Sequence, residues 1–354
     1  MILVLNAGSS SIKVAVFDRN LSSVIRGAVT RIGSDGEMKL GDTCRQITAL
    51  DHADALAQMF AALADAGYPL SSFTAAAHRI VHGGAILTKP ARVTPQVIAA
   101  IESVVPLAPL HNPNNLVGIT ALLAAAPALP QYCSIGTAFH ATNPAIAVRY
   151  AIPQAEHDAG IRRYGFHGIS YASLVASFGD ALPARLLALH LGNGASLCAI
   201  HHGKSIATSM GYSPLSGLTM GTRAGDIDGA AVLHIARELG VAETDEMLNN
   251  ESGLKALAGD SDMQNLLARD DPEAQFAIAH FCYWAARHAG SAIVAMGGVD
   301  AVAFTGGIGE NAAPIRDAIM GHLAFLGEIP VHVVPTTEEK QIARDALALI
   351  AAGQ

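Results

Sequence analysis

A short pattern that occurs twice constrains the fold of this 354-residue chain more than any other feature. One copy is LVLNAGSSSIKVAVFD at residues 3–18, and the other is LALHLGNGASLCAIHHG at residues 187–203. Each copy is an apolar run, a turn of Gly, Ser and Asn, and a second apolar run, which predicts a β-hairpin. The aligned positions are Leu3, Leu5 and Gly8 with Leu187, Leu189 and Gly192. Two copies predict two related lobes. Turns this rich in small residues can bring backbone N–H groups close to an anion, such as the phosphates of a nucleotide held in a cleft.

The composition agrees with two globular lobes and excludes several classes of protein. The chain is 51% hydrophobic and 15% charged, with 34 glycines, which is typical of an α/β protein rather than a disordered one. Its formal net charge of −8 gives no electrostatic reason to bind nucleic acid or anionic lipid. No run of about 18 apolar residues predicts a membrane span. The four cysteines form no CxxC pair, which argues against a zinc site and is typical of a cytoplasmic protein.

Local patterns predict strands and helices along the whole chain. Strands are expected at residues 2–6, 12–17, 74–82, 131–136, 301–307 and 331–335, with the second hairpin at 186–208. Helices are expected at residues 52–66, 95–104, 116–126, from 167 onward, and at 229–239, 272–296, 312–323 and 337–351. Three segments are expected to be irregular: a proline-rich loop at 106–115, residues 143–165, and a GIGEN turn at 307–311.

These elements predict the division of the chain into domains. We expect an N-terminal lobe at residues 1–140 and a C-terminal nucleotide-binding lobe at residues 141–336. The terminal helix, residues 337–354, is expected to pack on the N-terminal lobe.

Three basic residues stand in positions where a surface charge is out of place. Lys13 follows the first turn, Arg79 lies in HRIVHGG, and Arg223 lies in the glycine-rich MGTRAGDID. A buried guanidinium needs an anion and fits a carboxylate or a phosphate, so two such arginines suit a transferring phosphoryl group. The alternative is an internal ion pair of Arg223 with Asp226 or Asp228.

Histidines and glycine motifs give weaker signals. His111, His140, His167 and His190 each border a Gly, Pro or Asn turn, and without HxH or HExxH spacing they favour donation to a substrate oxygen over metal binding. HHGKS is not a Walker A loop, because Cys198 stands where that motif requires glycine. GIGENA follows a strand as a dinucleotide fingerprint would, but a single match is weak, and we keep it only as a nucleotide contact.

These segments together resemble the acetate and propionate kinase family of the actin-like and sugar-kinase superfamily. The resemblance rests on long motifs in the family's order that cover most of the chain: NAGSSSIK, HRIVHGG, PLAPLHNP, TAFHATNP, RRYGFHG, HLGNGAS, GKSIATSMGYSPLSGLTMGTRAGDID, FTGGIGENA and PTTEE. It implies an α/β fold of two lobes with duplicated ribonuclease-H-like cores, an active site in the cleft between the lobes, and usually a homodimer. It also implies reversible transfer of the ATP γ-phosphoryl group to acetate or another short-chain carboxylate. Mg²⁺ or Mn²⁺ would be the cofactor and acetyl phosphate the product.

The resemblance also implies roles for residues of the matched motifs. The transferring group would be surrounded by Arg79, His111, His167 and Arg223, and the acyl pocket would consist of Arg79, Val81, Leu110, Phe166 and Pro214. ATP would be contacted by Ser9, Ser11, Lys13, His190, Asn193, Gly194, Asp262, Gly307, Ile308 and Asn311, and the metal would be held by Asn6 and Glu338. Independently of the resemblance, a small acid needs an arginine for its carboxylate and an apolar wall for its methyl group. Val81 leaves less room than alanine would, so we expect acetate to be favoured over propionate.

Four departures from the family's pattern bear on activity. Gly136 stands before TAFH in place of an aspartate that helps to hold Mg²⁺, and phosphoryl transfer depends on the position of the metal. Gln264 replaces an arginine that often stacks near adenine, and Ile169 and Tyr171 replace the usual Thr and His. The chain is also shorter than typical members between Leu326 and Val331.

The sequence leaves two main hypotheses open. One is a kinase that acts on acetate, either with reduced activity or with another carboxylate at the metal, such as Glu338 or Glu310. The other is a non-catalytic member of the family that binds a nucleotide or an acyl phosphate. Propionate as the acceptor remains an alternative. A sugar kinase conflicts with the small apolar pocket and the paired arginines, and a dinucleotide oxidoreductase rests on one weak motif.

Overall fold

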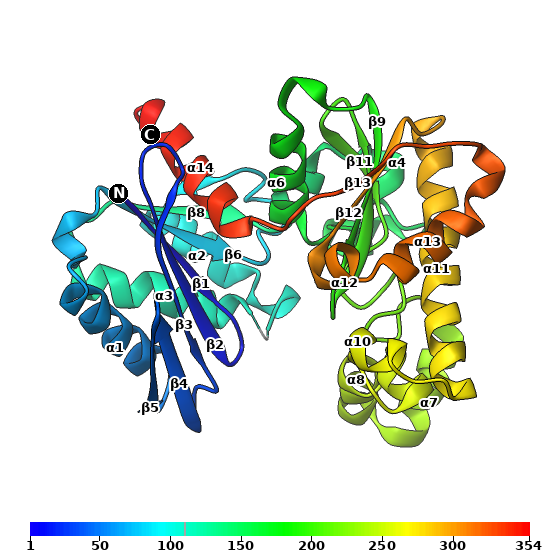
Figure 1. The fold of residues 1–354 in the computed structure, drawn as a ribbon, viewed down its shortest axis with the longest axis horizontal. Helices are drawn as coiled ribbons and strands as arrows, with labels where there is room; N and C mark the ends of the chain where they lie inside the picture. Colours follow the sequence, from blue (N-terminus) through cyan, green and yellow to red (C-terminus); the bar gives the residue numbers. More distant parts are fainter. Residues whose placement is uncertain (110) are drawn as a thin grey trace. The chain divides into compact units, whose positions relative to one another are not determined.

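The computed structural model describes residues 1–109 and 111–354, and this part of the chain divides into two compact units (Figure 1). Unit 1 comprises Met1–Phe139 and Thr337–Gln354, and unit 2 comprises His140–Thr336. Each unit has its own mixed β-sheet.

Unit 1 is built on an eight-stranded sheet in the order β5-β4-β3-β2-β1-β6-β8-β7. Its strands are β1 (Ile2–Ala7), β2 (Ser11–Phe17), β3 (Ser23–Thr30), β4 (Asp35–Leu40), β5 (Thr43–Thr48), β6 (Ala75–Ile80), β7 (Ala91–Arg92) and β8 (Gln131–Ile135). Its longer helices are α1 (His52–Asp65), α2 (Pro95–Ser103), α3 (Asn112–Ala125) and α14 (Glu338–Ala351). The apolar side chains of β1 and β2 pack with those of α1 in one buried cluster.

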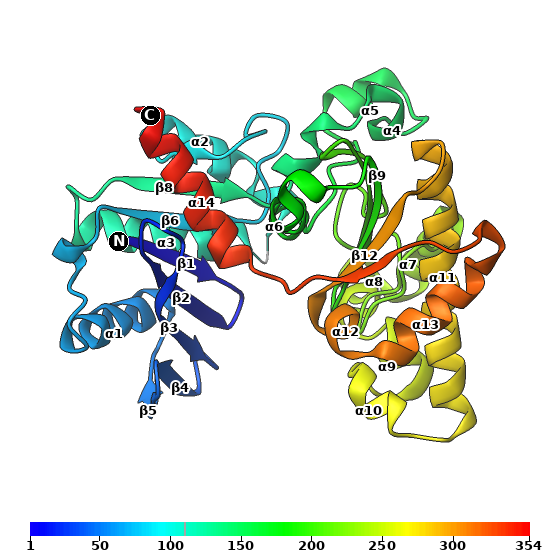
Figure 2. The same cartoon turned by 45° about the horizontal axis from the view of Figure 1, so that its top comes forward.

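The C-terminal helix α14 belongs to unit 1, although the rest of that unit ends about two hundred residues earlier in the chain. It contacts β1, β6 and β8, and Figure 2 shows it crossing in front of these strands. Ile342, Ala343 and Ala346 form its buried face. Because the first turn of α14 carries Glu338, this contact sets where that carboxylate lies within unit 1.

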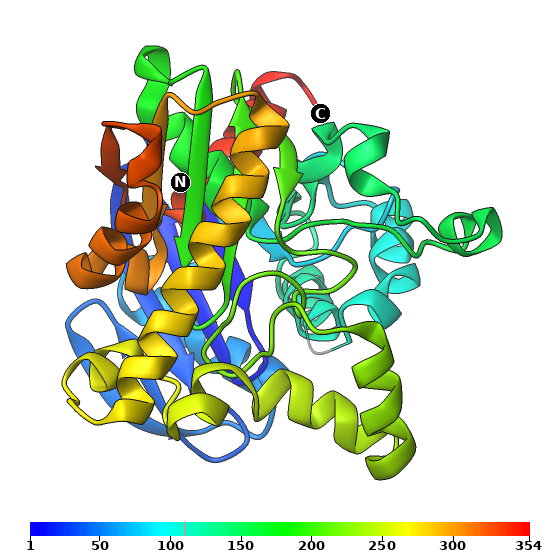
Figure 3. The ribbon, with the colours of Figure 1, turned by 90° about the vertical axis from the view of Figure 1, so that its right-hand side faces the viewer.

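Unit 2 has a five-stranded sheet in the order β11-β10-β9-β12-β13. The strands are β9 (Arg185–Leu191), β10 (Ala195–His201), β11 (Lys204–Thr208), β12 (Ala301–Thr305) and β13 (Val331–Val333). Its helices are α4 (Ala145–Val148), α5 (Gln154–Asp158), α6 (Gly168–Phe178), α7 (Gly229–Leu239), α8 (Val241–Asn250), α9 (Gly253–Ala258), α10 (Met263–Leu267), α11 (Pro272–Met296), α12 (Gly306–Asn311) and α13 (Ala313–His322). Figure 3 shows the long helix α11 running beside the sheet, and it contacts β9, β10 and β11.

The two sheets share one topology. The order β3-β2-β1-β6-β8 in unit 1 corresponds to β11-β10-β9-β12-β13 in unit 2. In each sheet the first three of these strands are antiparallel neighbours and the last three are parallel neighbours. The repeated sequence pattern forms β1–β2 in one sheet and β9–β10 in the other, so both predicted hairpins and the duplicated α/β core are confirmed.

The predictions for three irregular segments were wrong in part or in full. The proline-rich loop ends early, because α3 begins at Asn112 with a proline in its first turn, where the missing N–H costs nothing. Residues 143–165 contain the short helices α4 and α5, each of which begins directly after a proline. The predicted GIGEN turn is the helix α12, which begins at Gly306. That residue has φ 80°, and a Cβ there would lie 2.7 Å from the Leu191 carbonyl oxygen, so only glycine permits this bend.

Among the helices in residues 1–109 and 111–354, none combines the length and the apolar character that a membrane span requires.

Candidate active site

Three residues of unit 2 meet beside the turn that joins β9 to β10. A Cβ at Gly194 would lie 3.3 Å from Arg223 Nη1 and 3.4 Å from His167 Nε2. The Arg223 guanidinium and the His167 imidazole therefore both lie close to Gly194, and glycine at this position lets them approach the turn. An anion bound here would contact two side chains that can donate hydrogen bonds.

Arg223 has no carboxylate partner in the described part of the chain. Its Nη1 donates to the carbonyl oxygen of Pro214 at 3.3 Å and approaches the Met220 sulfur at 3.8 Å. Asp226 instead pairs with His288, and Asp228 caps α7 by accepting the N–H groups of Ala230 and Ala231. The predicted alternative of an internal ion pair for Arg223 was therefore wrong.

Burial lowers the pKa of Arg223 from its ordinary value, because desolvation disfavours the charged form. A guanidinium remains protonated nonetheless. A partly buried positive charge without a counter-ion is costly, and an anionic ligand offsets that cost when it binds.

His167 is held in a constrained conformation. Its φ of 58° lies in the left-handed region, where few residues other than glycine are found. His140, buried and with its pKa lowered to about 4 by desolvation, bonds the preceding Phe166 carbonyl oxygen through Nε2 at 2.8 Å. His167 Nδ1 lies 2.8 Å from Ser196 Oγ, and its ring stacks on His190 with centroids 4.2 Å apart. With these contacts, His167 Nε2 lies close to Gly194.

A cavity of about 800 Å³ lies in unit 2 next to the same turn. Gly192 lies between the histidine pair and the cavity, because a Cβ there would lie 4.0 Å from both His190 Nε2 and the Gly307 nitrogen. The cavity is lined by Gly192, Asn193, Ser261, Asp262, Met263, Gln264, Leu267, Gly307, Ile308, Asn311, Ala312 and Pro314. Its volume falls within the range of pockets that hold a drug-sized ligand or a cofactor.

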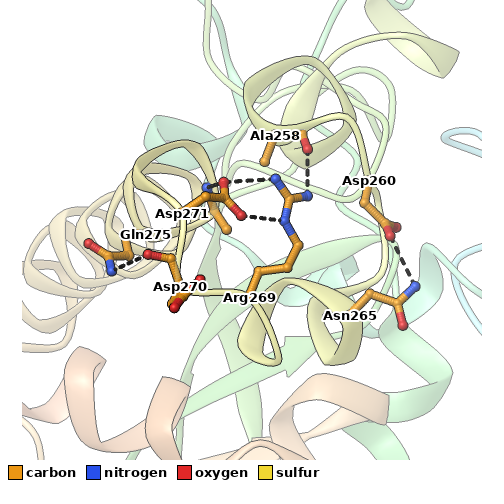
Figure 4. Close-up of polar contacts among 8 residues, drawn as sticks. Ala258, Asp260, Asn265, Arg269, Asp270, Asp271 and Gln275 are labelled. Atoms are coloured by element: carbon orange, nitrogen blue, oxygen red, sulfur yellow. Dashed lines mark hydrogen bonds and ion pairs between the residues drawn. The ribbon is translucent and has the colours of Figure 1, made fainter.

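The α10 wall of this cavity is braced by a single arginine (Figure 4). Arg269 donates twice to the Asp271 carboxylate, at 2.7 and 2.8 Å, and once to the Ala258 carbonyl oxygen at 2.7 Å. These bonds tie the segment before α10 to the start of α11, and the bidentate pair holds the pKa of Asp271 well below its ordinary value. Asp262 begins α10 and accepts the Gln264 N–H at 2.8 Å, so this predicted ATP contact also caps the helix.

Unit 1 contributes a second group of charged residues. Arg79 on β6 lies 3.3 Å, Nε to Oε2, from Glu338 at the start of α14. The N–H of Arg79 Nε is buried without a well-aligned hydrogen bond, so this contact leaves the Glu338 oxygens able to bind another group. Both side chains are largely buried, with 20% and 16% of their surface exposed.

The hairpin of unit 1 carries the other predicted polar residues. Asn6 on β1 lies opposite Lys13 on β2, so their side chains share one face of the sheet. The turn closes through a bond from the Gly8 N–H to the Ser11 carbonyl oxygen at 2.7 Å, with Ser9 exposed.

Two asparagines of the HNPNN segment hold the chain after Arg79 in place, and the sequence did not single them out. Asn115 accepts the Val81 N–H at 3.0 Å and donates to the Ala7 carbonyl oxygen at 2.7 Å. Asn112 exchanges two hydrogen bonds with the backbone of His82. The clustering of asparagines beside prolines was the available signal, because such side chains often bond to nearby backbone.

Gly136 lies against the backbone that follows β6. Its N–H donates to the Ile80 carbonyl oxygen at 2.7 Å, and a Cβ at this position would lie 2.7 Å from the Val81 carbonyl oxygen. Any side chain here therefore forces a shift of the segment that carries Val81. Glycine therefore stands in place of the expected aspartate where the backbone comes too close for a side chain.

One oxygen of the Glu310 carboxylate is engaged by hydrogen bonds within unit 2. Its Oε1 accepts hydrogen bonds from the Gly306 N–H and from the N–H and hydroxyl of Thr336, at 3.1, 2.8 and 2.8 Å. Within residues 1–109 and 111–354, no group of three or more His, Cys, Asp or Glu side chains is arranged to hold a metal ion.

The predicted site residues fall into two groups, one in each unit. Unit 2 brings together His167, His190, Asn193, Gly194 and Arg223, with Asp262, Gly307, Ile308 and Asn311 around the neighbouring cavity. Unit 1 contains Asn6, Ser9, Ser11, Lys13, Arg79, Val81, His111 and Glu338, of which His111 is the N-cap residue of α3. Of the predicted acyl pocket, Val81 lies in unit 1, Phe166 and Pro214 lie in unit 2, and Leu110 lies outside the described residues.

Known proteins resemble this chain in fold and in sequence along nearly its whole length. The acetokinase family model matches residues 1–334. A protein from Streptomyces avermitilis named acetate kinase is 41% identical, over 99% of this chain and 97% of that protein. A propionate kinase structure from Francisella tularensis has a TM-score of 0.93 at 35% identity, covering 97% of this chain and 98% of the other. The acetate kinase structure from Porphyromonas gingivalis has a TM-score of 0.90 at 33% identity, covering 99% of each chain.

The family match and the full-length relatives identify this chain as a phosphotransferase. The class is one that uses ATP and takes a carboxyl group as acceptor. This chain belongs to the acetokinase family.

Proposed function

We propose that the chain transfers the γ-phosphoryl group of ATP reversibly to acetate. An acetate oxygen forms a bond to the γ-phosphorus as the bond to the β,γ-bridging oxygen breaks, which gives acetyl phosphate and ADP. The single observation that carries this proposal is the partly buried Arg223 guanidinium, which has no carboxylate partner in the described part of the chain and approaches the same glycine, Gly194, as His167 Nε2. Charge that develops on the equatorial oxygens of a transferring phosphoryl group is stabilised by such preorganised donors.

The remaining steps of binding are assigned to the other predicted residues. The adenosine would occupy the cavity beside Asp262 and Gly307, and the β9–β10 turn would contact the phosphates. Arg79 would bind the acceptor carboxylate, with Val81 against its methyl group. Because one methylene in an apolar pocket is worth only about 1–3 kcal/mol, we expect a partial preference for acetate over propionate.

We also propose that Mg²⁺ or Mn²⁺ binds with the nucleotide. A magnesium ion that bridges phosphates usually requires only one or two protein carboxylates. Glu338 and Asn6 would supply oxygen ligands in unit 1, since the aligned contacts of Glu338 do not saturate its carboxylate. When bound, the ion would neutralise charge on the phosphates.

A hydroxamate assay for acetyl phosphate tests the proposal directly. We expect the wild-type chain to form product from ATP, Mg²⁺ and acetate, and to form less from propionate and butyrate at equal concentration. No product from any of the three acids, together with measurable ATP binding, would support the non-catalytic alternative that Gly136 suggests.

Substitutions at Gly136 distinguish two effects: the lack of a carboxylate at this position, and the close approach of the backbone, which leaves no room for a side chain. Gly136→Ala is expected to lower the free energy of unfolding by about 1–3 kcal/mol, because its Cβ meets the Val81 carbonyl oxygen. Gly136→Asp should be destabilised by a similar amount and should be no more active than wild type. Thermal unfolding and the hydroxamate assay on both variants check this. An aspartate variant that is as stable as wild type and several times more active would show that the wild-type site lacks only that carboxylate.

We further propose that the chain forms a homodimer through α7. No residue of this helix is buried, and an apolar row of Ile227, Leu233, Leu239 and Val241 on and beside it is between 40% and 79% exposed. Apolar patches of this kind are typical of protein–protein interfaces. Sedimentation should give twice the mass of one chain for wild type and one chain for Leu233→Asp. The exposed Leu50, in unit 1, provides the control: Leu50→Asp should remain a dimer, and a monomeric wild type would contradict the proposal.

A further inference from the structure

A carboxylate on α12 ties this helix to the last residue of unit 2. Glu310 Oε1 accepts the Gly306 N–H at 3.1 Å, and it accepts both the N–H and the hydroxyl of Thr336 at 2.8 Å. The Thr336 hydroxyl in turn accepts the Gly306 N–H at 2.9 Å and lies 2.9 Å from the Thr305 hydroxyl. We call these four residues, Thr305, Gly306, Glu310 and Thr336, the Glu310 network. Thr305 and Gly306 are buried, so part of the network is shielded from water.

The Glu310 network begins where the pairing of β12 with β13 ends. The two strands are parallel neighbours, and just after β13 the Val334 N–H still donates to the Phe304 carbonyl oxygen at 2.9 Å. The chain of β12 then bends at Gly306 into α12, so the strand pairing cannot continue. Helical side chains lean toward the start of their helix, and Glu310 thereby accepts the Thr336 N–H in place of a strand carbonyl.

The Glu310 network joins two segments that carry proposed functional residues. Gly307, Ile308 and Asn311 of α12 line the cavity proposed for the nucleoside. Unit 2 ends at Thr336, and Glu338, the proposed metal ligand, follows two positions later in the first turn of α14. A restraint on α12 is therefore passed by hydrogen bonds to Thr336 and by the main chain toward Glu338.

We propose that Glu310 is a positioning residue that fixes the point at which the chain leaves unit 2, so that a nucleotide bound at α12 restrains the segment that leads to Glu338. This role rests on the functions proposed above for the cavity and for Glu338. It differs from the hypothesis that Glu310 itself holds the metal, because positioning requires an oxygen that accepts hydrogen bonds rather than a negative charge. Glu310→Gln keeps such an oxygen, and Glu310→Ala does not.

Hydrogen–deuterium exchange of the full chain, read by mass spectrometry, tests the Glu310 network without catalysis. In the nucleotide-free protein, peptides that contain Gly306 or Thr336 should exchange about tenfold faster in Glu310→Ala than in wild type, because both amides lose a bond to a charged group. ADP should slow exchange at residues 306–311 in both proteins. It should slow exchange at Thr336 in wild type only.

Enzyme kinetics with the same variants separate positioning from metal binding. In Glu310→Ala we expect kcat to fall by a factor of about 10–100, with a higher Mg²⁺ concentration for half-maximal rate. In Glu310→Gln both quantities should stay within about threefold of wild type, since the amide oxygen still accepts the N–H and hydroxyl groups, although less strongly than a carboxylate. Glu328→Ala is the matched control, because Glu328 is an exposed glutamate of unit 2 whose removal should alter neither exchange nor rate.

Three results would overturn the proposal. The first is unchanged exchange at Thr336 in Glu310→Ala, and the second is ADP protection of α12 in wild type that does not extend to Thr336. The third is a Glu310→Gln variant as impaired as Glu310→Ala, since the charge is then required, as it is for a metal ligand. If Glu310→Ala fails to fold, Thr336→Val decides, because it removes both hydroxyl bonds and should speed exchange at Gly306. The expected exchange pattern in a protein that binds ADP but transfers no phosphate to acetate would support the role of Glu310 and contradict only the proposed function.

Discussion

Arg223→Met is expected to lower kcat for acetyl phosphate formation by a factor of about 10³ or more, because arginines that stabilise a transferring phosphoryl group contribute 10³–10⁵ to the rate. The midpoint of thermal unfolding should stay the same or rise. Arg223 is partly buried and has no carboxylate partner in the described residues, so an apolar side chain of similar length removes a desolvation cost and gives up only its 3.3 Å bond to Pro214 and a weak sulfur contact. A large loss of activity without a loss of stability is the signature of a residue placed for its ligand.

The hydroxamate assay and a thermal melt on the same preparation check this expectation. Arg92→Met is the matched control, because Arg92 is an exposed arginine on β7 and its removal should alter neither quantity. If Arg223→Met is strongly destabilised or retains near-wild-type turnover, Arg223 has a structural role and the mechanism must be revised.

Glu338→Gln is expected to lower kcat by a factor of about 100 or more and to raise the Mg²⁺ concentration needed for half-maximal rate. Gly136 supplies no carboxylate and one oxygen of Glu310 is occupied by three hydrogen bonds, so we expect Glu338 to carry more of the metal binding here than it would beside a second carboxylate. The loss of its contact with Arg79 should cost about 1 kcal/mol of stability at most, since that pair lacks good alignment.

A Mg²⁺ titration of the initial rate measures the effect, and Glu339→Gln is the matched control. Glu339 stands next to Glu338 in the first turn of α14, so both substitutions remove the same favourable charge from the helix N-terminus. Equal Mg²⁺ dependence in the two variants would remove Glu338 from the metal site.

Several elements could be predicted from the sequence because their signals are local. The helix at Pro272–Met296 and the strands of the first hairpin match their predicted limits to within one residue. The predicted range of the second hairpin, 186–208, contains β9, β10 and also β11. Apolar periodicity and glycine turns are features of one segment, so they can be recognised without knowledge of the rest of the chain. The sequence analysis did not predict β3, β4 and β5, although the alternation of Glu37 and Lys39 with the buried Met38 and Leu40 in β4 is typical of a half-buried strand.

The candidate site, too, could be predicted from the sequence only in part. The motifs predicted which residues belong near the ligand, but not what those residues contact. That Arg223 lacks an ion pair depends on where Asp226 and Asp228 find other partners. That Gly136 cannot receive a side chain without a backbone shift depends on Val81, which lies 55 positions earlier (136 − 81).

The sequence by itself determined the duplicated hairpin core and the family, because both are recognised from runs of neighbouring residues. Only the tertiary structure decided that α14 returns to unit 1, that Asn115 bonds Ala7, and that Glu310 bonds Thr336. The physical reason is that hydrogen bonds and desolvation act over a few ångströms in space. Strand pairing and helix contacts set those distances, and residues far apart in the sequence supply the partners.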